Sequence, residues 1–265
     1  MILDPINSIT SVAFYRKVAK QSAGRSLVYL GYLALLFAVA ATWAVKVRVM
    51  PVVAETFDWL EKTMPPLTFS GGKLSTPLQA PLTVRHPKMA SVGVIIDSNR
   101  TEPVTPQMLE QNNVVGYLTG NALYVIRSPG QLEVYDFSKT AAAGGSKPTV
   151  IDGEFYRNAA KLCGTIIYPS AAAASFLFFL AWKLLSSLIY SMVAMMINAS
   201  TEAKLAYAPL FNISVYAQTL ITVIQAMLLF IPGQVPMFSL AALIITGVYL
   251  WLAIKTNGPT AALPA

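Results

Sequence analysis

A lysine inside an apolar segment is the residue with the clearest chemical potential. Lys183 interrupts an otherwise uncharged stretch from Pro169 to Ile197. An ammonium group within a bilayer is costly unless it is paired or hydrated. No Asp or Glu falls in the apolar segments, so its partner would be a carbonyl, water, a lipid phosphate or an acid on another protein. The alternative is that its four-carbon stem reaches an interface.

A polar stripe follows in the next apolar segment. Gln218, Thr222 and Gln225 are spaced by four and three residues, which places them on one face of a helix. Such side chains join neighbouring helices through hydrogen bonds, or they line a path for a solute. Together with Lys183 they are the candidate residues for an interaction inside the membrane.

The remaining reactive residues argue against an enzyme. The chain has one histidine, His86, expected in a loop, and one cysteine, Cys163, expected to pack as a small apolar residue. Neither metal-ligand spacing nor an acid/base pair emerges among the carboxylates. We therefore expect no catalytic residue, no metal and no cofactor. The carboxylates considered, all expected to be surface charges, are Asp97, Glu102, Glu110, Glu133 and Asp136.

Composition indicates a membrane protein. Apolar residues make up 55% of the 265 residues and charged residues only 12%, about half the charged share of an ordinary soluble domain. The net charge of +7 is scattered along the chain, whereas nucleic-acid binding needs a basic face. We expect a lipid bilayer and other membrane subunits as partners, and no nucleic acid.

The apolar segments predict four transmembrane helices with a small α+β domain inserted between the first and the second. Nineteen uncharged residues, Leu27 to Val45, would reach about 28 Å, close to a hydrocarbon core. The predicted order is a basic amphipathic segment (1–25), helix 1 (26–46), the extracytoplasmic domain (47–168), helix 2 (169–197), a cytoplasmic loop (198–212), helix 3 (213–231), helix 4 (237–254) and a cytoplasmic tail (255–265).

The N-terminal segment predicts an interfacial helix over residues 4–22, with a loosely ordered tail as the alternative. Its basic residues are candidates for lipid headgroup contacts; they are Arg16, Lys17, Lys20 and Arg25. By the positive-inside rule, this end lies in the cytoplasm. An even number of spans returns the C-terminus to the same side, as in a bacterial inner-membrane protein.

The inserted domain alternates helix and strand patterns. Residues 53–64 predict a helix stopped by Pro65-Pro66, and Gly71-Gly72 predicts a hairpin turn. Further strands are expected at 92–96, 114–118, 123–126 and 132–137, helices at 105–111 and 152–162, and a flexible loop at 141–147. We expect an antiparallel sheet.

Four segments carry a resemblance to a known family. They are Phe14-Tyr15-Arg16, the stretch from Pro66 to Leu74 with its Gly71-Gly72-Lys73 turn, Val94-Ile95-Ile96-Asp97, and Val115-Gly116-Tyr117-Leu118 leading into Gly120-Asn121. In these the chain resembles a bacterial family of integral membrane proteins of unknown function that includes a maltodextrin-utilisation protein. The resemblance implies one span, an outer domain and three further spans, and at most an association with a transport system.

Two functions follow as expectations. The first is a non-catalytic accessory or scaffold subunit that docks with a larger membrane complex and binds or senses a partner through its outer domain. The second is a small-solute transporter or channel component that uses the polar stripe and Lys183.

Overall fold

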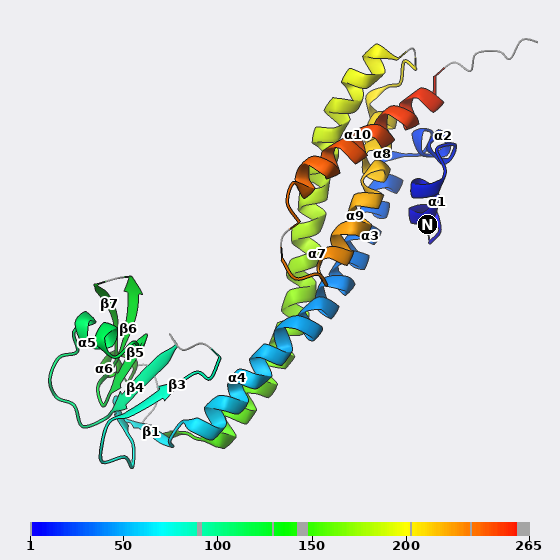
Figure 1. Ribbon diagram of the computed structural model, residues 1–265. Helices are drawn as coiled ribbons and strands as arrows, with labels where there is room; N and C mark the ends of the chain where they lie inside the picture. The colour runs from blue at the N-terminus through cyan, green and yellow to red at the C-terminus, as the bar shows by residue number, and fades with distance from the viewer. Residues whose placement is uncertain are drawn as a thin grey trace, which may run out of the picture. The chain divides into compact units, whose positions relative to one another are not determined.

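The chain forms two compact units in a computed structural model. The structure describes residues 2–88, 92–128, 130–141, 148–201, 203–233 and 235–258. The helical unit comprises Met1–Met50 and Ile166–Ala265, and the mixed unit comprises Pro51–Thr165 (Figure 1).

The helical unit is built from apolar helices and two short N-terminal ones. Four helical stretches are long and apolar enough to cross a membrane: Ala23–Thr63, Gly153–Ser200, Tyr207–Leu228 and Phe238–Thr256. The elements are α1 (Asp4–Thr10), α2 (Phe14–Ala19), α3 (Ala23–Ala44), the π-helical turn η1 (Val45–Val49), α7 (Gly153–Ser200), whose first turns belong to the mixed unit, α8 (Tyr207–Ala217), α9 (Thr219–Leu228) and α10 (Phe238–Thr256).

The helix α7 differs from a surface helix of a water-soluble protein, because it buries polar side chains and exposes large apolar ones. On α7 the side chains of Lys183, Ser187 and Ser191 are buried. The exposed side of the same helix carries Phe178, Trp182, Leu185, Ile189, Met192 and Met196. Large exposed apolar surfaces of this kind mark contact with lipid or with another protein. The helical unit therefore has the surface expected of a membrane-embedded bundle.

The core of the helical unit is centred on α8. Every residue from Leu210 to Ala217 is buried, and the Tyr216 ring stacks on Tyr29 of α3 with centroids 3.9 Å apart. Asn212 joins the same two helices, because its Oδ1 accepts a hydrogen bond from Ser26 at 2.7 Å. A helix that is covered on all sides must be mostly hydrophobic, and its buried polar side chains need hydrogen-bond partners. On α8, Asn212 and Ser214 have such partners.

Three helices are longer or differently divided than the sequence pattern predicts. From Ala23 to Thr63 the helix is uninterrupted through η1 and α4 (Met50–Thr63), and α7 continues through Pro169. The third apolar helix begins at Tyr207 and is divided at Gln218 into α8 and α9. The described connection before it is therefore shorter than the predicted loop 198–212, and Glu202 in that loop lies outside the described residues.

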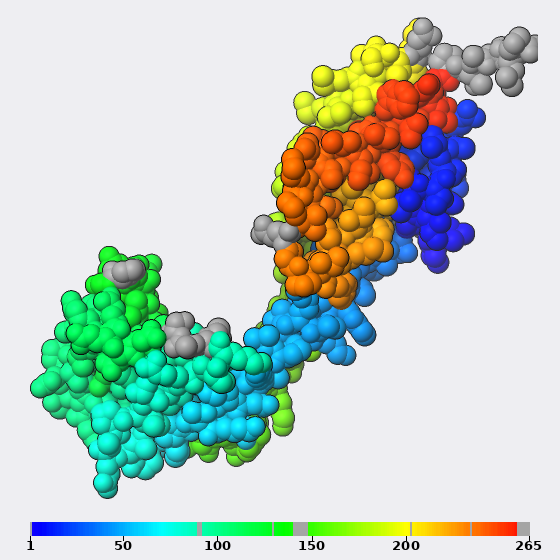
Figure 2. All heavy atoms as spheres, in the orientation of Figure 1, coloured from blue at the N-terminus to red at the C-terminus, as the bar shows by residue number. Residues whose placement is uncertain are grey.

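The N-terminal segment is not the single helix predicted over 4–22. It forms α1 and α2, and Tyr15 and Val18 of α2 are buried in the bundle core. The Arg16 Nε donates to the carbonyl of Thr256 at the end of α10, 3.0 Å away. In Figure 2 the N-terminal segment (blue) lies beside α10 (red). Because Tyr15 and Val18 pack in the core with α8 and α10, α2 is part of the bundle, whereas the apolar side chains of Ile2 and Ile6 beside and on α1 are exposed.

The mixed unit contains two small sheets. The larger has the strand order β3-β4-β5-β6-β7 and the smaller has β2-β1-β8. The elements after α4 are β1 (Leu67–Ser70), β2 (Lys73–Ser75), β3 (Leu82–Arg85), β4 (Gly93–Asp97), α5 (Pro106–Gln111), β5 (Gly116–Thr119), β6 (Ala122–Ser128), β7 (Gln131–Asp136), α6 (Phe137–Ala141) and β8 (Thr149–Ile151).

The prediction of a purely antiparallel sheet is wrong at one strand pair. Strands β4 and β5 are parallel, since the chain between them contains α5 and is long enough to cross over. The predicted hairpin is β1-β2, and both glycines of its turn have positive φ, 58° for Gly71 and 77° for Gly72. Strands β3 and β8 and helix α6 had no clear pattern in the sequence. Pro129 and the predicted loop residues 142–147 lie outside the described residues.

Both faces of the larger sheet are covered, because neighbouring side chains of a strand point to opposite faces. Ile95 of β4 packs with Leu109 of α5 and Tyr117 of β5. Its neighbour Ile96 packs on the opposite face, with the β1-β2 hairpin and Trp59 of α4. The mixed unit therefore has its own hydrophobic core.

Candidate functional site: a polar cavity among apolar helices

The buried face of α7 carries a ladder of polar side chains. Lys183, Ser187 and Ser191 are spaced by four residues, so they lie above one another on the helix. The Ser187 Oγ donates to the Lys183 carbonyl at 2.8 Å, and the Ser191 Oγ donates to the Ser187 carbonyl at 2.6 Å. The two hydroxyls are thereby satisfied within the helix, while the Lys183 ammonium extends beyond it.

Gln218 links this ladder to the neighbouring helix. It stands between α8 and α9, and its Nε2 donates to the Ser187 Oγ at 2.8 Å and to the Ser214 carbonyl at 3.1 Å. Its Oε1 is buried and has no hydrogen-bond partner. The carboxamide is therefore held in place by its nitrogen and presents its oxygen as a free acceptor.

A cavity of about 170 Å³ opens beside these residues. Its polar lining comes from α7, from α9 and the residue before it, and from α10: Lys183, Ser186, Tyr190, Gln218, Gln225, Ser239 and Thr246. Pockets for drug-sized ligands measure about 300–1,000 Å³, and a single water needs about 10–15 Å³. The cavity therefore suits several waters, a small ion or one inserted side chain.

Several polar atoms in and near the cavity lack a partner. Besides the Gln218 Oε1, these are the Gln225 Oε1 and the Thr246 Oγ1 in the lining, and the Thr222 Oγ1 one helical turn from Gln225. Buried polar groups are nearly always hydrogen-bonded in folded proteins. A cluster of unsatisfied acceptors and hydroxyls around one cavity therefore points to a ligand, an inserted side chain or ordered water.

The Lys183 ammonium has an aromatic neighbour and no acid. Its Nζ lies 5.3 Å from the centroid of the Phe179 ring, which stacks on Phe37 of α3 at 4.0 Å. Within the described ranges, no acid forms an ion pair with Lys183. A cation–π contact offsets part of the cost of burying the charge and leaves the ammonium able to donate three hydrogen bonds.

The arrangement is suited to binding a carboxylate. The ammonium and the hydroxyl of Thr246 can donate to carboxylate oxygens, and the carboxamide oxygens can accept from waters or from polar hydrogens beside that carboxylate. Among the described residues that line the cavity, none is His, Cys, Asp or Glu. The described lining thus offers an amine, hydroxyls and carboxamides as hydrogen-bonding groups.

The structure brings three of the four candidate intramembrane residues to this one cavity. Lys183, Gln218 and Gln225 line it, whereas Thr222 is buried close to it on the same helix as Gln225. Sequence reasoning missed Ser187 and Thr246. Ser187 could have been found from its position four residues after Lys183, but no local signal marks Thr246.

The candidate lipid-contact residues lie elsewhere in the helical unit. Arg16, Lys17 and Lys20 surround a shallow hollow on α2 and the residues beside it, and Arg25 is exposed in the first turn of α3. Arg16 also caps α10 through Thr256. These side chains are therefore available to headgroups, with Arg16 additionally serving the fold.

Polar residues of the mixed unit form one local network. The Tyr117 hydroxyl donates to Asp97 Oδ2 at 3.0 Å, and the Arg100 guanidinium lies 5.4 Å from the Tyr117 ring. Burial raises the pKa of Tyr117 above its usual value, which keeps the phenol a donor.

Two other carboxylates of the mixed unit bond to nearby backbone groups. Glu110 and Asp136 accept from the backbone amides of Gly130 and Ser138. Among the described residues, no group of three or more His, Cys, Asp or Glu could hold a metal.

His86 follows β3 in a loop, as predicted, but it has partners that the sequence did not indicate. It is buried, its ring lies 5.0 Å from the Trp59 ring, and its Nδ1 accepts from the Lys88 amide. The contact with α4 explains its burial, because Trp59 packs against the same core. His86 is therefore a core residue of the mixed unit.

Comparison with known proteins gives a family match, which covers nearly the whole chain. No match was found among curated proteins or among solved structures. The sequence profile of a family described as a protein of unknown function, DUF1189, matches residues 6–254. That range includes the whole mixed unit, the polar cavity and the four apolar helices except the last two residues of the fourth. The chain therefore belongs to the DUF1189 family.

Proposed function

We propose that this protein is a non-catalytic subunit of a membrane complex, and that the cavity around Lys183 receives the carboxylate of a partner's transmembrane helix. The observation that carries the proposal is a buried ammonium that has no described acid partner and faces a cavity with unsatisfied polar atoms. A charge in an apolar bundle is retained only if something compensates it in the working state.

The size of the cavity supports a side chain over a larger ligand. About 170 Å³ is too small for an oligosaccharide, given that ligand pockets start at about 300 Å³. The maltodextrin association suggested by the resemblance would then run through a partner protein rather than through sugar binding in this cavity.

The exposed face of α7, which lies away from the buried Lys183 side, supports docking with other membrane subunits as a separate contact. Phe178, Trp182, Leu185, Ile189, Met192 and Met196 recur at alternating intervals of four and three, which is the heptad spacing of packed helix pairs. We further propose that the complex lies in a bacterial inner membrane, with both termini in the cytoplasm and the mixed unit outside as its sensing or binding domain.

Purification from native membranes in a mild detergent tests the proposal. We expect a second membrane protein in fixed stoichiometry, identified by mass spectrometry and carrying an Asp or Glu in a transmembrane helix. Lys183→Met should release it, while Lys204→Met, in the connection before α8, should not. A charge swap, with Lys183→Glu and the partner acid changed to Lys, should restore the complex. A monodisperse single chain from wild type would refute the proposal.

A solute carboxylate is the second candidate, since the same cavity would accept a small free anion. In that case wild type would purify alone, and a small carboxylate such as acetate would raise its melting temperature in a Lys183-dependent manner. Flux in proteoliposomes would then fall in Lys183→Met and Gln225→Leu. This outcome would favour a transporter over a subunit.

A further inference from the structure

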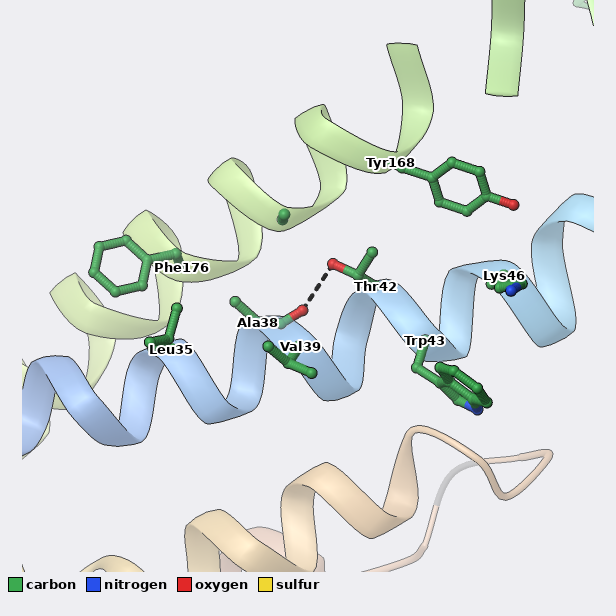
Figure 3. A pocket seen from close by; sticks show the side chains of 9 residues that line it. Leu35, Ala38, Val39, Thr42, Trp43, Lys46, Tyr168 and Phe176 are labelled. Atoms are coloured by element: carbon green, nitrogen blue, oxygen red, sulfur yellow. Dashed lines mark hydrogen bonds between the residues drawn. The ribbon is translucent and has the colours of Figure 1, made fainter. Parts of the chain in front are cut away.

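A second, larger cavity lies on the helical unit between α3 and α7. It is a groove of about 400 Å³ lined by Leu35, Val39 and Thr42 of α3 and by Ala172 and Phe176 of α7 (Figure 3). The Thr42 hydroxyl donates to the Ala38 carbonyl at 2.8 Å, so its polarity is satisfied inside the helix. The body of the groove therefore offers only apolar contacts.

Polar groups are confined to one end of the groove. Lys46 and Tyr168 lie at that end, whereas Leu35 and Phe176 lie at the other (Figure 3). The Lys46 Nζ is 5.4 Å from the Trp43 ring, and the indole is more than half exposed. Aromatic and basic residues together are typical of the level of lipid headgroups. The groove thus has an apolar body and a cationic mouth.

The dimensions of the groove match one leaflet. From Leu35 to Lys46 the helix advances eleven residues, or about 16 Å, which is about half of a 30 Å hydrocarbon core. The volume of about 400 Å³ falls within the range of small-molecule ligand pockets. The length and the apolar lining of the groove therefore suit one hydrocarbon chain that ends at the cationic mouth.

We propose that this groove binds one acyl chain of an anionic phospholipid, with the headgroup phosphate at Lys46 and Tyr168. The chain fills the apolar body, and the ammonium and the phenol hydroxyl donate to phosphate oxygens. The site lies apart from the Lys183 cavity, since the two share no lining residue. It does not depend on the proposed subunit function.

The test uses the full-length protein in detergent, delipidated and titrated with phosphatidylglycerol or with phosphatidylcholine of the same acyl chains. Native mass spectrometry counts bound lipids, and brominated acyl chains report proximity to Trp43 by quenching. One basic residue near a membrane favours anionic lipid by about five-fold. We expect Lys46→Gln to lose a preference of that size, and Ala172→Phe to reduce binding of both lipids by blocking the groove.

The matched control is Lys255→Gln. Lys255 also lies over a tryptophan, 4.9 Å from the Trp251 ring, but it does not line the groove, so its loss should leave lipid binding unchanged. Ala172→Leu provides a milder block if the phenylalanine variant does not fold. Equal preference in wild type and Lys46→Gln, undiminished binding in both Ala172 variants, or a copurifying polypeptide crosslinked to Trp43 would overturn the proposal.

Discussion

At the scale of single residues, Lys183 places a buried positive charge in the helical unit that needs a compensating partner. Its side chain is 4% exposed, and Phe179 is the neighbour that contacts its ammonium. An aromatic face compensates a buried cation only partly. The isolated chain therefore carries an electrostatic cost that a carboxylate in the cavity would remove.

Replacing Lys183 by methionine should stabilise the isolated protein. A central lysine costs about 2.5–3.5 kcal/mol in a transmembrane helix, and about 1 kcal/mol shifts the melting temperature of a chain of this size by about 2–4 °C. Because the contact with the Phe179 ring already offsets part of the cost, we expect a rise of roughly 3–8 °C. Tryptophan fluorescence during heating in detergent measures it. A lower melting temperature would mean that Lys183 is already compensated in the isolated chain.

The Gln218–Ser187 hydrogen bond should appear as a coupling between α7 and the α8–α9 junction. In a double-mutant cycle with Gln218→Met and Ser187→Ala, we expect a coupling of about 0.6 kcal/mol, the mean for such bonds inside membranes. Unfolding in increasing SDS provides the free energies. Ser186→Ala is the control, since the Ser186 hydroxyl donates to the Trp182 carbonyl instead. Additivity of the Gln218 and Ser187 changes would contradict this geometry.

At the scale of elements, a few side chains stabilise the ends of the helices by bonding to backbone groups there. The Arg48 Nη1 donates to the carbonyls of Leu229 and Ile231 beyond α9, at 3.0 and 3.1 Å. Asp152 precedes α7, and its Oδ1 accepts from the Phe155 amide at 3.0 Å. Such caps satisfy backbone groups that a helix end leaves unpaired.

Removing the Asp152 cap should loosen the first turn of α7. A cap of this kind contributes about 1 kcal/mol, so Asp152→Ala should speed hydrogen exchange of amides 154–156 by about five-fold. Asp152→Asn keeps an acceptor oxygen and should leave exchange nearly unchanged. Equal acceleration in both variants would show that charge, rather than the hydrogen bond, stabilises this turn.

At the scale of the whole molecule, four apolar helices separate the chain into a helical unit and a mixed unit with its own core. The first unit has large apolar side chains on its exterior as well as in its core, which suits a bilayer, whereas the second unit has hydrophobic faces inside and charges outside. The surface of the helical unit therefore suits lipid, and the surface of the mixed unit suits water.

Cysteine labelling should place the two units' polar surfaces on opposite sides of the membrane. In a Cys163→Ala background, Thr101→Cys in the mixed unit should react with a membrane-impermeant maleimide on spheroplasts, whereas Lys20→Cys should react only after permeabilisation. Both positions are exposed in the fold, so a difference in labelling reports topology. The reverse pattern would invert the orientation derived from the N-terminal basic residues.

The sequence by itself determined the features that depend on local periodicity. Uncharged stretches of about twenty residues indicate the apolar helices because length and polarity alone decide whether a segment suits a bilayer. Spacings of three and four placed Gln218, Thr222 and Gln225 on one face. The Gly71-Gly72 turn was predictable because both positions require positive φ.

Only the tertiary structure decided which faces meet. The rotation of α7 about its axis, which turns Lys183 toward Gln218 and Gln225, depends on side chains from segments far apart in the sequence. For the same reason the pairing of β4 with β5, the burial of His86 against Trp59 and the packing of Tyr15 on the bundle had no local signal. Helix periodicity specifies a face, and long-range packing specifies what that face contacts.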